Sequence, residues 1–173
     1  QNNGTAIGIS GIIRRTTNGG LNWSSQTITV GNLFGIYFTN ASTGYICGDG
    51  GVVAKTTNGG TSWLNQTVPV ELFRGLFFTD DNTGYACGSG GLVIKTTNGG
   101  SNWLTQTTPN ANFLQNIGFI DAQTGFAVGS AGTAIKTTDG GNNWTALNTG
   151  TTTLLFGLAV TSSAIIYAAG EGG

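Results

Sequence analysis

An eight-residue phrase that recurs four times constrains the fold of this chain more than any other feature. The second copy is Thr56-Thr-Asn-Gly-Gly-Thr-Ser-Trp63, and the other copies span Thr16–Trp23, Thr96–Trp103 and Thr137–Trp144. Trp occurs nowhere else, and its four positions are 40, 40 and 41 residues apart. Self-similarity at a fixed period of this length indicates a repeat architecture in which each copy is one supersecondary unit.

The phrase has the composition of a tight turn between two strands. An Asx residue followed by Gly-Gly, as in Asn58-Gly59-Gly60, favours a turn because the Asx side chain bonds to nearby backbone and Gly accepts positive φ. Extended runs flank it, over residues 51–57 and 63–68 in the second copy. We therefore predict a hairpin corner after which the Trp ring folds back into the core, as an anchor rather than a ligand platform.

Each repeat contains four candidate strands of five to seven residues, which in the second repeat are 33–39, 44–48, 51–57 and 63–68. No stretch keeps a helical apolar period, so the chain is predicted to be all-β. Four short antiparallel strands per 40 residues are typical of a β-propeller blade. We predict one propeller domain, or a portion of one, over residues 1–173, with repeats at 1–31 (partial), 32–71, 72–111, 112–152 and 153–173 (partial).

Composition narrows the possible partners. Charged residues make up 8% of the chain and the net charge is -1, which gives no electrostatic footprint for nucleic acid. No apolar run is long enough for insertion into a membrane. The low charge and the abundance of Thr, Asn and Gly favour a secreted, periplasmic or cell-surface protein.

The two cysteines occupy equivalent places in their repeats. Cys47 and Cys87 are 40 residues apart, and the same place holds Ile7 and Val128 in the other copies. A position that accepts Cys, Val or Ile is a small buried apolar position, so we predict unbridged core thiols.

The repeated phrase resembles the Asp-box of bacterial neuraminidase-type repeats, as in Thr96-Thr-Asn-Gly-Gly-Ser-Asn-Trp103. The longer stretch from Gly48 to Trp63 is similar to the repeat of the photosystem II assembly/stability factor family. The resemblance implies a propeller of about seven blades, roughly 280 residues at this period. We therefore expect part of a larger propeller, or a small one closed by its own ends, with open strand edges that pair with further blades or with another copy. It also implies a protein partner bound through a basic patch, for which the chain offers only Arg14, Arg15 and Arg74.

The residues for familiar catalytic sites are missing from the sequence. The chain has no His, which excludes Ser-His-Asp and Cys-His arrangements and His-based metal sites. A sialidase-like site, as in the Asp-box family, would need three convergent arginines and a Tyr nucleophile, and the arginines here do not occupy equivalent places. Asp139 belongs to a turn, and we expect Asp80, Asp81 and Asp121 to cap loops. We predict no catalytic residues, no metal and no cofactor.

A basic residue recurs before each turn. These residues are Arg15, Lys55, Lys95 and Lys136. A ring of like-placed cations would bind anions, but the spacing also fits outer-strand residues that shield a sheet edge, and we favour the second interpretation.

Propellers usually bind their ligands with the loops between the second and third strands and between the fourth and first strands. In this chain the residues at those places vary between repeats while the core positions do not. We predict a ligand-binding site from Asp49, Glu71, Arg74, Ser89, Gln115, Ser130, Phe156 and Glu171. The favoured function is a non-catalytic scaffold that binds a protein or glycan. Two alternatives stay open: a fragment of an Asp-box glycoside hydrolase, and a structural surface or filament protein.

Overall fold

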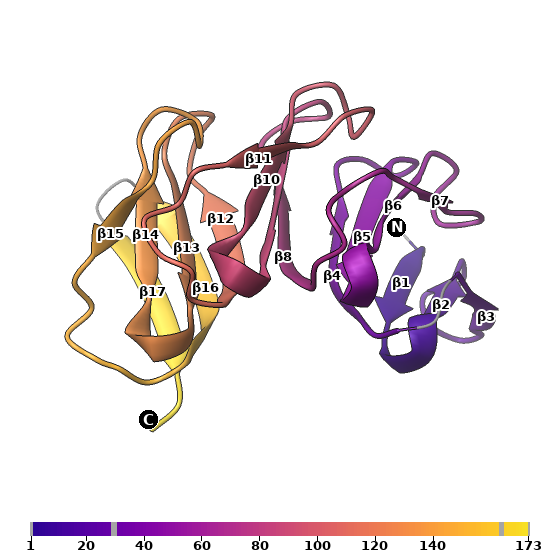
Figure 1. Cartoon of the computed structure of the whole chain (residues 1–173). Coiled ribbons are helices and arrows are strands. Elements are labelled where there is room, and N and C mark those ends of the chain that lie inside the picture. Colours follow the sequence, from indigo (N-terminus) through magenta and orange to yellow (C-terminus); the bar gives the residue numbers. More distant parts are fainter. Residues whose placement is uncertain (1, 29–30, 163–164, 173) are drawn as a thin grey trace. The chain divides into compact units, whose positions relative to one another are not determined.

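The computed structural model describes residues 2–28, 31–162 and 165–172, and its strands form five separate antiparallel sheets (Figure 1). The first sheet contains β1 (Gly4–Ile7), β2 (Ile12–Thr16) and β3 (Ser24–Thr27). The second contains β4 (Leu33–Phe38), β5 (Gly44–Gly48), β6 (Val53–Thr56) and β7 (Leu64–Asn65). Short 3-10 turns follow the second strand of the repeat: η1 (Ile9–Gly11), η2 (Asp49–Gly51), η3 (Ser89–Gly91) and η4 (Ser130–Gly132).

The later sheets repeat this pattern. The third contains β8 (Phe73–Phe78), β9 (Gly84–Gly88), β10 (Val93–Thr96) and β11 (Leu104–Gln106). The fourth contains β12 (Leu114–Phe119), β13 (Gly125–Gly129), β14 (Ala134–Thr137) and β15 (Thr145–Leu147). The fifth contains β16 (Leu155–Ser162) and β17 (Ile165–Gly170). Consecutive strands are neighbours throughout, which confirms the predicted all-β, four-stranded units.

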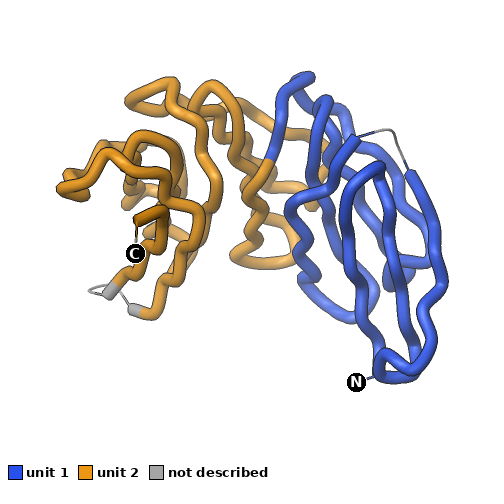
Figure 2. The backbone as a smooth tube through the Cα atoms, turned by 90° about the horizontal axis from the view of Figure 1, so that it is seen from below, with its two compact units in different colours: residues 1–73 blue, residues 74–173 orange. Residues whose placement is uncertain are grey.

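The chain divides into two compact units, residues 1–73 and 74–173 (Figure 2). The apolar core of the first unit gathers around Ile13, Leu33 and Ile46, with the partly buried Trp63 packed against them. The core of the second unit includes Tyr85, Phe119 and Trp144. Both cores combine inward-facing residues of successive strands, as period-two patterning requires.

The repeated phrase forms the predicted hairpin corner through one set of hydrogen bonds. The Thr56 hydroxyl donates to Asn58 Oδ1 at 2.9 Å and accepts the N–H of Gly60 at 2.9 Å. Asn58 Oδ1 also accepts the Ser62 N–H at 3.0 Å. The other three copies contain the same bonds, with Asp139 replacing Asn in the last. The Thr and Asx side chains thus satisfy the turn's own backbone donors.

Three of the four Trp residues after the turns meet a Phe from the innermost strand. Phe38 with Trp63, Phe78 with Trp103 and Phe119 with Trp144 form edge-to-face pairs at centroid distances of 6.0, 6.1 and 6.0 Å. Trp103 and Trp144 are only 9% and 6% exposed. The anchoring interpretation is wrong for Trp23, which is 44% exposed. The first sheet consists of strands equivalent to β5, β6 and β7, so it lacks the strand type that supplies the Phe.

Two strand predictions are also wrong in extent. The third strand of the second repeat begins at Val53 rather than Gly51, because Gly50 and Gly51 have φ values of 66° and 75° in the η2 turn. The fourth strands contain two to four residues, not five or more. Each is the outer strand of its sheet, and short outer strands limit unwanted edge pairing. Cys47 and Cys87 are buried and unbridged as predicted, and burial raises the pKa of Cys47 to about 12 although the backbone N–H of Gly35 opposes this.

Candidate functional site

The predicted site residues lie where the innermost strand of each sheet begins. Antiparallel pairing places Leu33 opposite Gly48, Leu114 opposite Gly129 and Leu155 opposite Gly170. The start of the inner strand therefore meets the turn that follows the second strand. The loops singled out from the sequence share this end within each sheet.

A β-bulge occurs at the second residue of the inner strand. The register shifts between Leu33 and Gly35, between Leu114 and Asn116, and between Leu155 and Gly157. The bulged residues are Phe34, Gln115 and Phe156, and Arg74 holds the same place in the sequence of β8. Phe156 is 51% exposed and Arg74 is also exposed. A bulge redirects the side chain away from the ladder, so this place is suited to recognition rather than to packing.

The turns after the second strands use their backbone to hold the start of the inner strand. The N–H groups of Asp49, Ser130 and Glu171 each donate, at 2.9 Å, to the carbonyl of the residue preceding that strand. The Asp49 carboxylate also accepts the Asn32 N–H at 2.9 Å, and the Ser130 hydroxyl donates to the Phe113 carbonyl at 3.3 Å. Asp49 and Ser130 thus stabilise their own loops.

The other two predicted loop residues have different surroundings. The Glu71 carbonyl accepts the Gly51 N–H at 2.6 Å, while its side chain is exposed. Ser89 is half-buried in η3, where its carbonyl accepts the Leu92 N–H at 3.1 Å.

In the second unit the structure brings several predicted residues together through two that sequence reasoning missed. The Arg74 guanidinium lies 5.9 Å from the centre of the Phe113 ring, and Ser130 holds the Phe113 backbone. The Asn116 side-chain amide donates to the Phe156 carbonyl at 3.4 Å. Arg74 and Ser130 are thus linked through Phe113, and Asn116 separately contacts the backbone of Phe156. Asp49 and Glu71 belong to the first unit. The residue before each inner strand varies as the site residues do, and this variation is the signal that would have identified Phe113.

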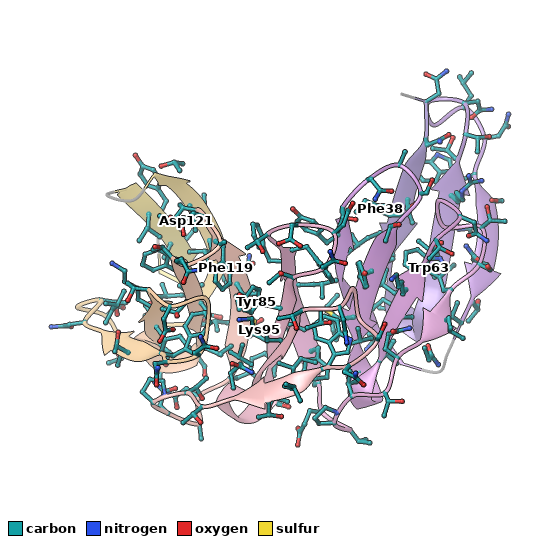
Figure 3. All side chains as sticks on the ribbon, turned by 90° about the horizontal axis from the view of Figure 1, so that it is seen from above. Phe38, Trp63, Tyr85, Lys95, Phe119 and Asp121 are labelled. Carbon is teal, nitrogen blue, oxygen red and sulfur yellow. The ribbon has the colours of Figure 1, made fainter. Side chains whose placement is uncertain are left out.

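Two of the basic residues before the turns, Arg15 and Lys95, form links between sheets. All four lie on strands with a neighbour on each side, so the edge-shielding interpretation is wrong. Lys95 lies on β10, between β9 and β11, with its ammonium 5.7 Å from the centre of the Tyr85 ring. Both Lys95 Nζ and the Tyr85 hydroxyl donate to the Gly140 carbonyl in the fourth sheet's turn, each at 2.7 Å (Figure 3). Arg15 Nε donates to the equivalent Gly59 carbonyl at 2.7 Å. Burial, with smaller effects from Asp80 and Asp139, raises the pKa of Tyr85 to about 12, so the phenol stays a donor.

Three carboxylates act as loop caps or turn residues. Asp121 Oδ1 accepts the N–H groups of Thr124 and Gln123 at 2.6 and 2.8 Å, which lowers the pKa of Asp121. Asp80 is held in the same way. Desolvation is the largest single effect and opposes the shift, but hydrogen bonds from Asn82, Thr83 and Thr79 together lower the pKa of Asp80. These contacts confirm the predicted capping by Asp80 and Asp121.

Asp139 is held by its turn. Hydrogen bonds led by the Asn143 side chain lower the pKa of Asp139 to about 2. All three carboxyl groups are therefore poor general acids, because that role needs a raised pKa.

In the described part of the chain, no group of three or more His, Cys, Asp or Glu residues is placed to hold a metal ion. No helix among the described residues has the length and apolar character that a membrane crossing requires.

The sequence matches the family described as photosynthesis system II assembly factor YCF48 over residues 20–110, more than half of the chain. The chain belongs to the YCF48 family. No curated protein matches it. The structure of YCF48 bound to D1 peptide is 20% identical, with a TM-score of 0.69 over 82% of this chain and 47% of that one. YCF48 from Cyanidioschyzon merolae is 15% identical, with a TM-score of 0.73 over 98% of this chain and 64% of that one.

The same fold also occurs outside the YCF48 family. The GH74 enzyme of Niastella koreensis is 20% identical, with a TM-score of 0.75 over 99% of this chain and 32% of that one. At these identities the likeness shows the fold, a β-propeller with four-stranded antiparallel blades, and not the activity. The chain spans less than two thirds of the length of each of these structures.

Proposed function

We propose that this YCF48-family chain is a non-catalytic propeller module that binds a protein partner. The proposed binding surface is the group Arg74, Phe113, Gln115 and Phe156 in the second unit. The observation that carries the proposal is the β-bulge, which places Gln115 in one blade and Phe156 in the next at the same point of an otherwise repeated frame. An exposed Arg beside aromatic rings is the composition that protein interfaces favour.

The family and the carboxylates both support binding over hydrolysis. A solved YCF48 structure contains a bound D1 peptide, which makes a peptide the first ligand class to test here. The GH74 relatives keep a glycoside hydrolase open as the alternative. Against it, Asp80, Asp121 and Asp139 accept local hydrogen bonds and have lowered pKa values, whereas glycoside hydrolysis needs a carboxylic acid with a raised one.

We further propose that the module acts outside the cytoplasm, as a secreted, periplasmic or surface protein. The support is compositional: few charged residues and abundant Thr, Asn and Gly. Detection of the native protein only in the cytoplasmic fraction of its source cells would contradict this proposal.

The binding surface is tested by capture of partners from the source organism with the purified chain as bait. We expect Arg74→Ala and Phe156→Ala each to weaken capture of the same protein at least tenfold, as for residues central to an interface. Arg14→Ala is the matched control, since Arg14 is exposed on β2 of the first unit. Unchanged capture by both variants, or turnover of oligosaccharides by the chain, would contradict the proposal. Light scattering of the same samples tests the remaining alternative, a structural surface or filament protein that self-associates through open strand edges.

A further inference from the structure

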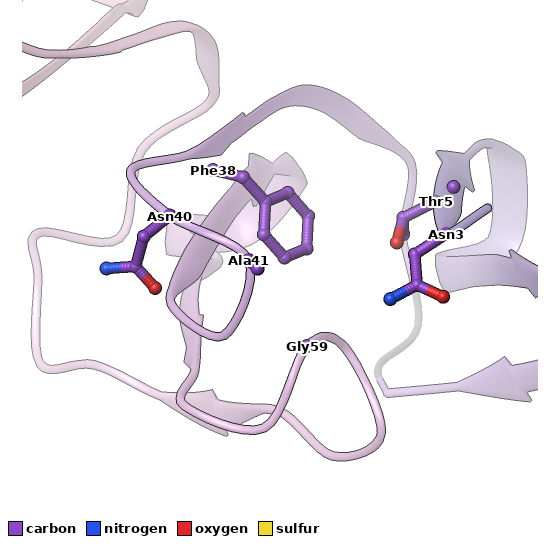
Figure 4. A pocket seen from close by; sticks show the side chains of 7 residues that line it. Asn3, Thr5, Phe38, Asn40, Ala41 and Gly59 are labelled. Atoms are coloured by element: carbon purple, nitrogen blue, oxygen red, sulfur yellow. The ribbon is translucent and has the colours of Figure 1, made fainter. Parts of the chain in front are cut away.

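The first unit contains a cavity that the proposed binding surface does not include. It has a volume of about 390 Å³ and opens between the first and second sheets (Figure 4). The residues that line it are Asn3, Gly4, Thr5, Phe38, Asn40, Ala41 and Gly59. Phe38 ends β4, whereas the bulge marks the start of the inner strand, so the cavity and the bulge lie at opposite ends of the strands.

The second unit contains the same frame with a tyrosine in this place. By their positions in the repeat, Thr5, Phe38 and Gly59 correspond to Tyr85, Phe119 and Gly140. The Tyr85 ring stacks on Phe119, with centroids 4.0 Å apart and planes inclined by 20°. Its hydroxyl donates to the Gly140 carbonyl at 2.7 Å. One phenol ring therefore closes the space between the third and fourth sheets.

The first unit keeps the ladder pair and the hydrogen bond from the basic residue to the glycine carbonyl. Thr5 pairs with Arg15 in the ladder as Tyr85 pairs with Lys95, and Arg15 Nε bonds to the Gly59 carbonyl as Lys95 Nζ bonds to that of Gly140. A Cβ built on Gly60 would lie 3.4 Å from the Thr5 hydroxyl, and one on the equivalent Gly141 would lie 2.8 Å from the Tyr85 ring. Thr5 thus points to the same place but stops short of it.

The missing ring leaves an aromatic surface uncovered. Phe38 is half-buried, whereas Phe119 is only 6% exposed. The Gly59 carbonyl accepts one hydrogen bond from Arg15, and a carbonyl oxygen has two lone pairs. A ligand that fits these features has a flat ring for Phe38 and a hydroxyl donor for Gly59.

We infer that this cavity is a binding site for a tyrosine side chain of a partner polypeptide. The partner ring takes the place relative to Phe38 and Gly59 that Tyr85 takes relative to Phe119 and Gly140. The site does not depend on the surface around Arg74, so either can fail alone.

The test is a titration of the isotope-labelled chain with N-acetyl-tyrosine amide, followed by nuclear magnetic resonance. The backbone amide signals of Gly59 and Gly60 are expected to shift and saturate. Those of Gly140 and Gly141 stay in place, since Tyr85 fills their pocket, and they serve as the control within the same molecule. N-acetyl-phenylalanine amide is expected to bind roughly fivefold more weakly, which is the value of one hydrogen bond. N-acetyl-alanine amide is expected not to shift Gly59.

Two variants complete the test. Thr5→Tyr should fill the cavity from within and abolish the Gly59 shift. Phe38→Leu, which keeps an apolar side chain, should weaken binding severalfold and remains informative if Thr5→Tyr does not fold. Absence of saturable shifts at Gly59, equal affinity for the tyrosine and phenylalanine amides, or an unchanged titration of the Phe38 variant would each overturn the inference. So would binding of p-cresol with no binding of the tyrosine amide, because it would point to a small phenol instead.

Discussion

The contact between the first two sheets and the contact between the third and fourth sheets share one frame but end differently. In the second unit Tyr85 joins the third sheet to Phe119 and Gly140 of the fourth, and the contact is part of the core. In the first unit Thr5 leaves a cavity beside Phe38 and Gly59. The backbone turn, the basic residue and the Phe are common to both. Two differences accompany this change: the second strand carries Thr5 in place of Tyr85, and the first sheet has no counterpart of β8, whose Phe77 stacks on Phe119 at a centroid distance of 6.0 Å.

The largest expected loss of stability comes from replacing the Phe that occupies the equivalent position in each contact, Phe119 in the second unit and Phe38 in the first. Phe119→Ala should lower the free energy of unfolding by about 3–5 kcal/mol, because its ring packs against Tyr85, Phe77 and Trp144. Phe38→Ala should lower it by about half as much, because Phe38 is only half-buried. Denaturant unfolding of both variants measures the difference, and equal losses would contradict the comparison.

Tyr85→Thr tests whether the ring alone distinguishes the two contacts. The variant should reproduce the Thr5 arrangement in the second unit and lower the free energy of unfolding by roughly 2–4 kcal/mol, through the lost ring packing and the cavity. The amide signals of Gly140 and Gly141 should then respond to N-acetyl-tyrosine amide as those of Gly59 and Gly60 do. If the variant folds but its Gly140 amide signal does not shift with N-acetyl-tyrosine amide, residues other than Tyr85 also distinguish the two contacts.

Tyr85→Phe separates the ring from its hydroxyl. We expect a loss of about 1 kcal/mol in unfolding free energy, the usual net value of one hydrogen bond. The loss stays small because Lys95 still donates to the Gly140 carbonyl. Calorimetry of Tyr85→Phe and Tyr85→Thr should give Tyr85→Phe an unfolding free energy much closer to that of the original chain. An equal loss in the two variants would mean that the hydroxyl, not the ring, supplies most of the stabilisation.

The smallest effect at neutral pH is expected for Asp139→Asn, which gives the fourth turn the residue of the other three. The folded-state pKa of Asp139 is about 2, below the ~3.9 of an unfolded chain. Its stabilising contribution is therefore complete above about pH 4 and is lost as the pH falls towards 2. The original chain should lose more stability than the variant across this window. Parallel acid-unfolding curves would refute this role for the carboxylate.

Much of the fold could be predicted because the repeat specifies it through interactions between residues close together in the sequence. The Thr56, Asn58 and Gly60 hydrogen bonds span at most four residues, so the phrase alone specifies the turn. Gln115 and Phe156 at the bulges, and Arg74 at the same place in β8, could be singled out from the sequence because they vary within a constant frame. The fourth strands were predicted too long, because strand propensity carries no information on which strands are outer strands with only one neighbour.

The remainder depended on contacts between repeats. Lys95 and Gly140 are 45 residues apart, and no local pattern pairs them. Trp23 carries the same motif as Trp144 but is exposed, because its partner ring would come from a strand type that the first sheet does not contain. Phe113 and Asn116 were missed because they join the site only through neighbours on other strands.

The sequence by itself determined the four-stranded unit, its turn, its buried thiols and the absence of His chemistry, because each follows from neighbouring residues or from composition. Only the tertiary structure decided that Arg15 and Lys95 bind glycine carbonyls of the next blade, and that Thr5 and Tyr85, at equivalent positions, lie beside a cavity in one unit and within a closed core in the other. The physical reason is distance along the chain: these outcomes depend on packing between residues that only folding brings together.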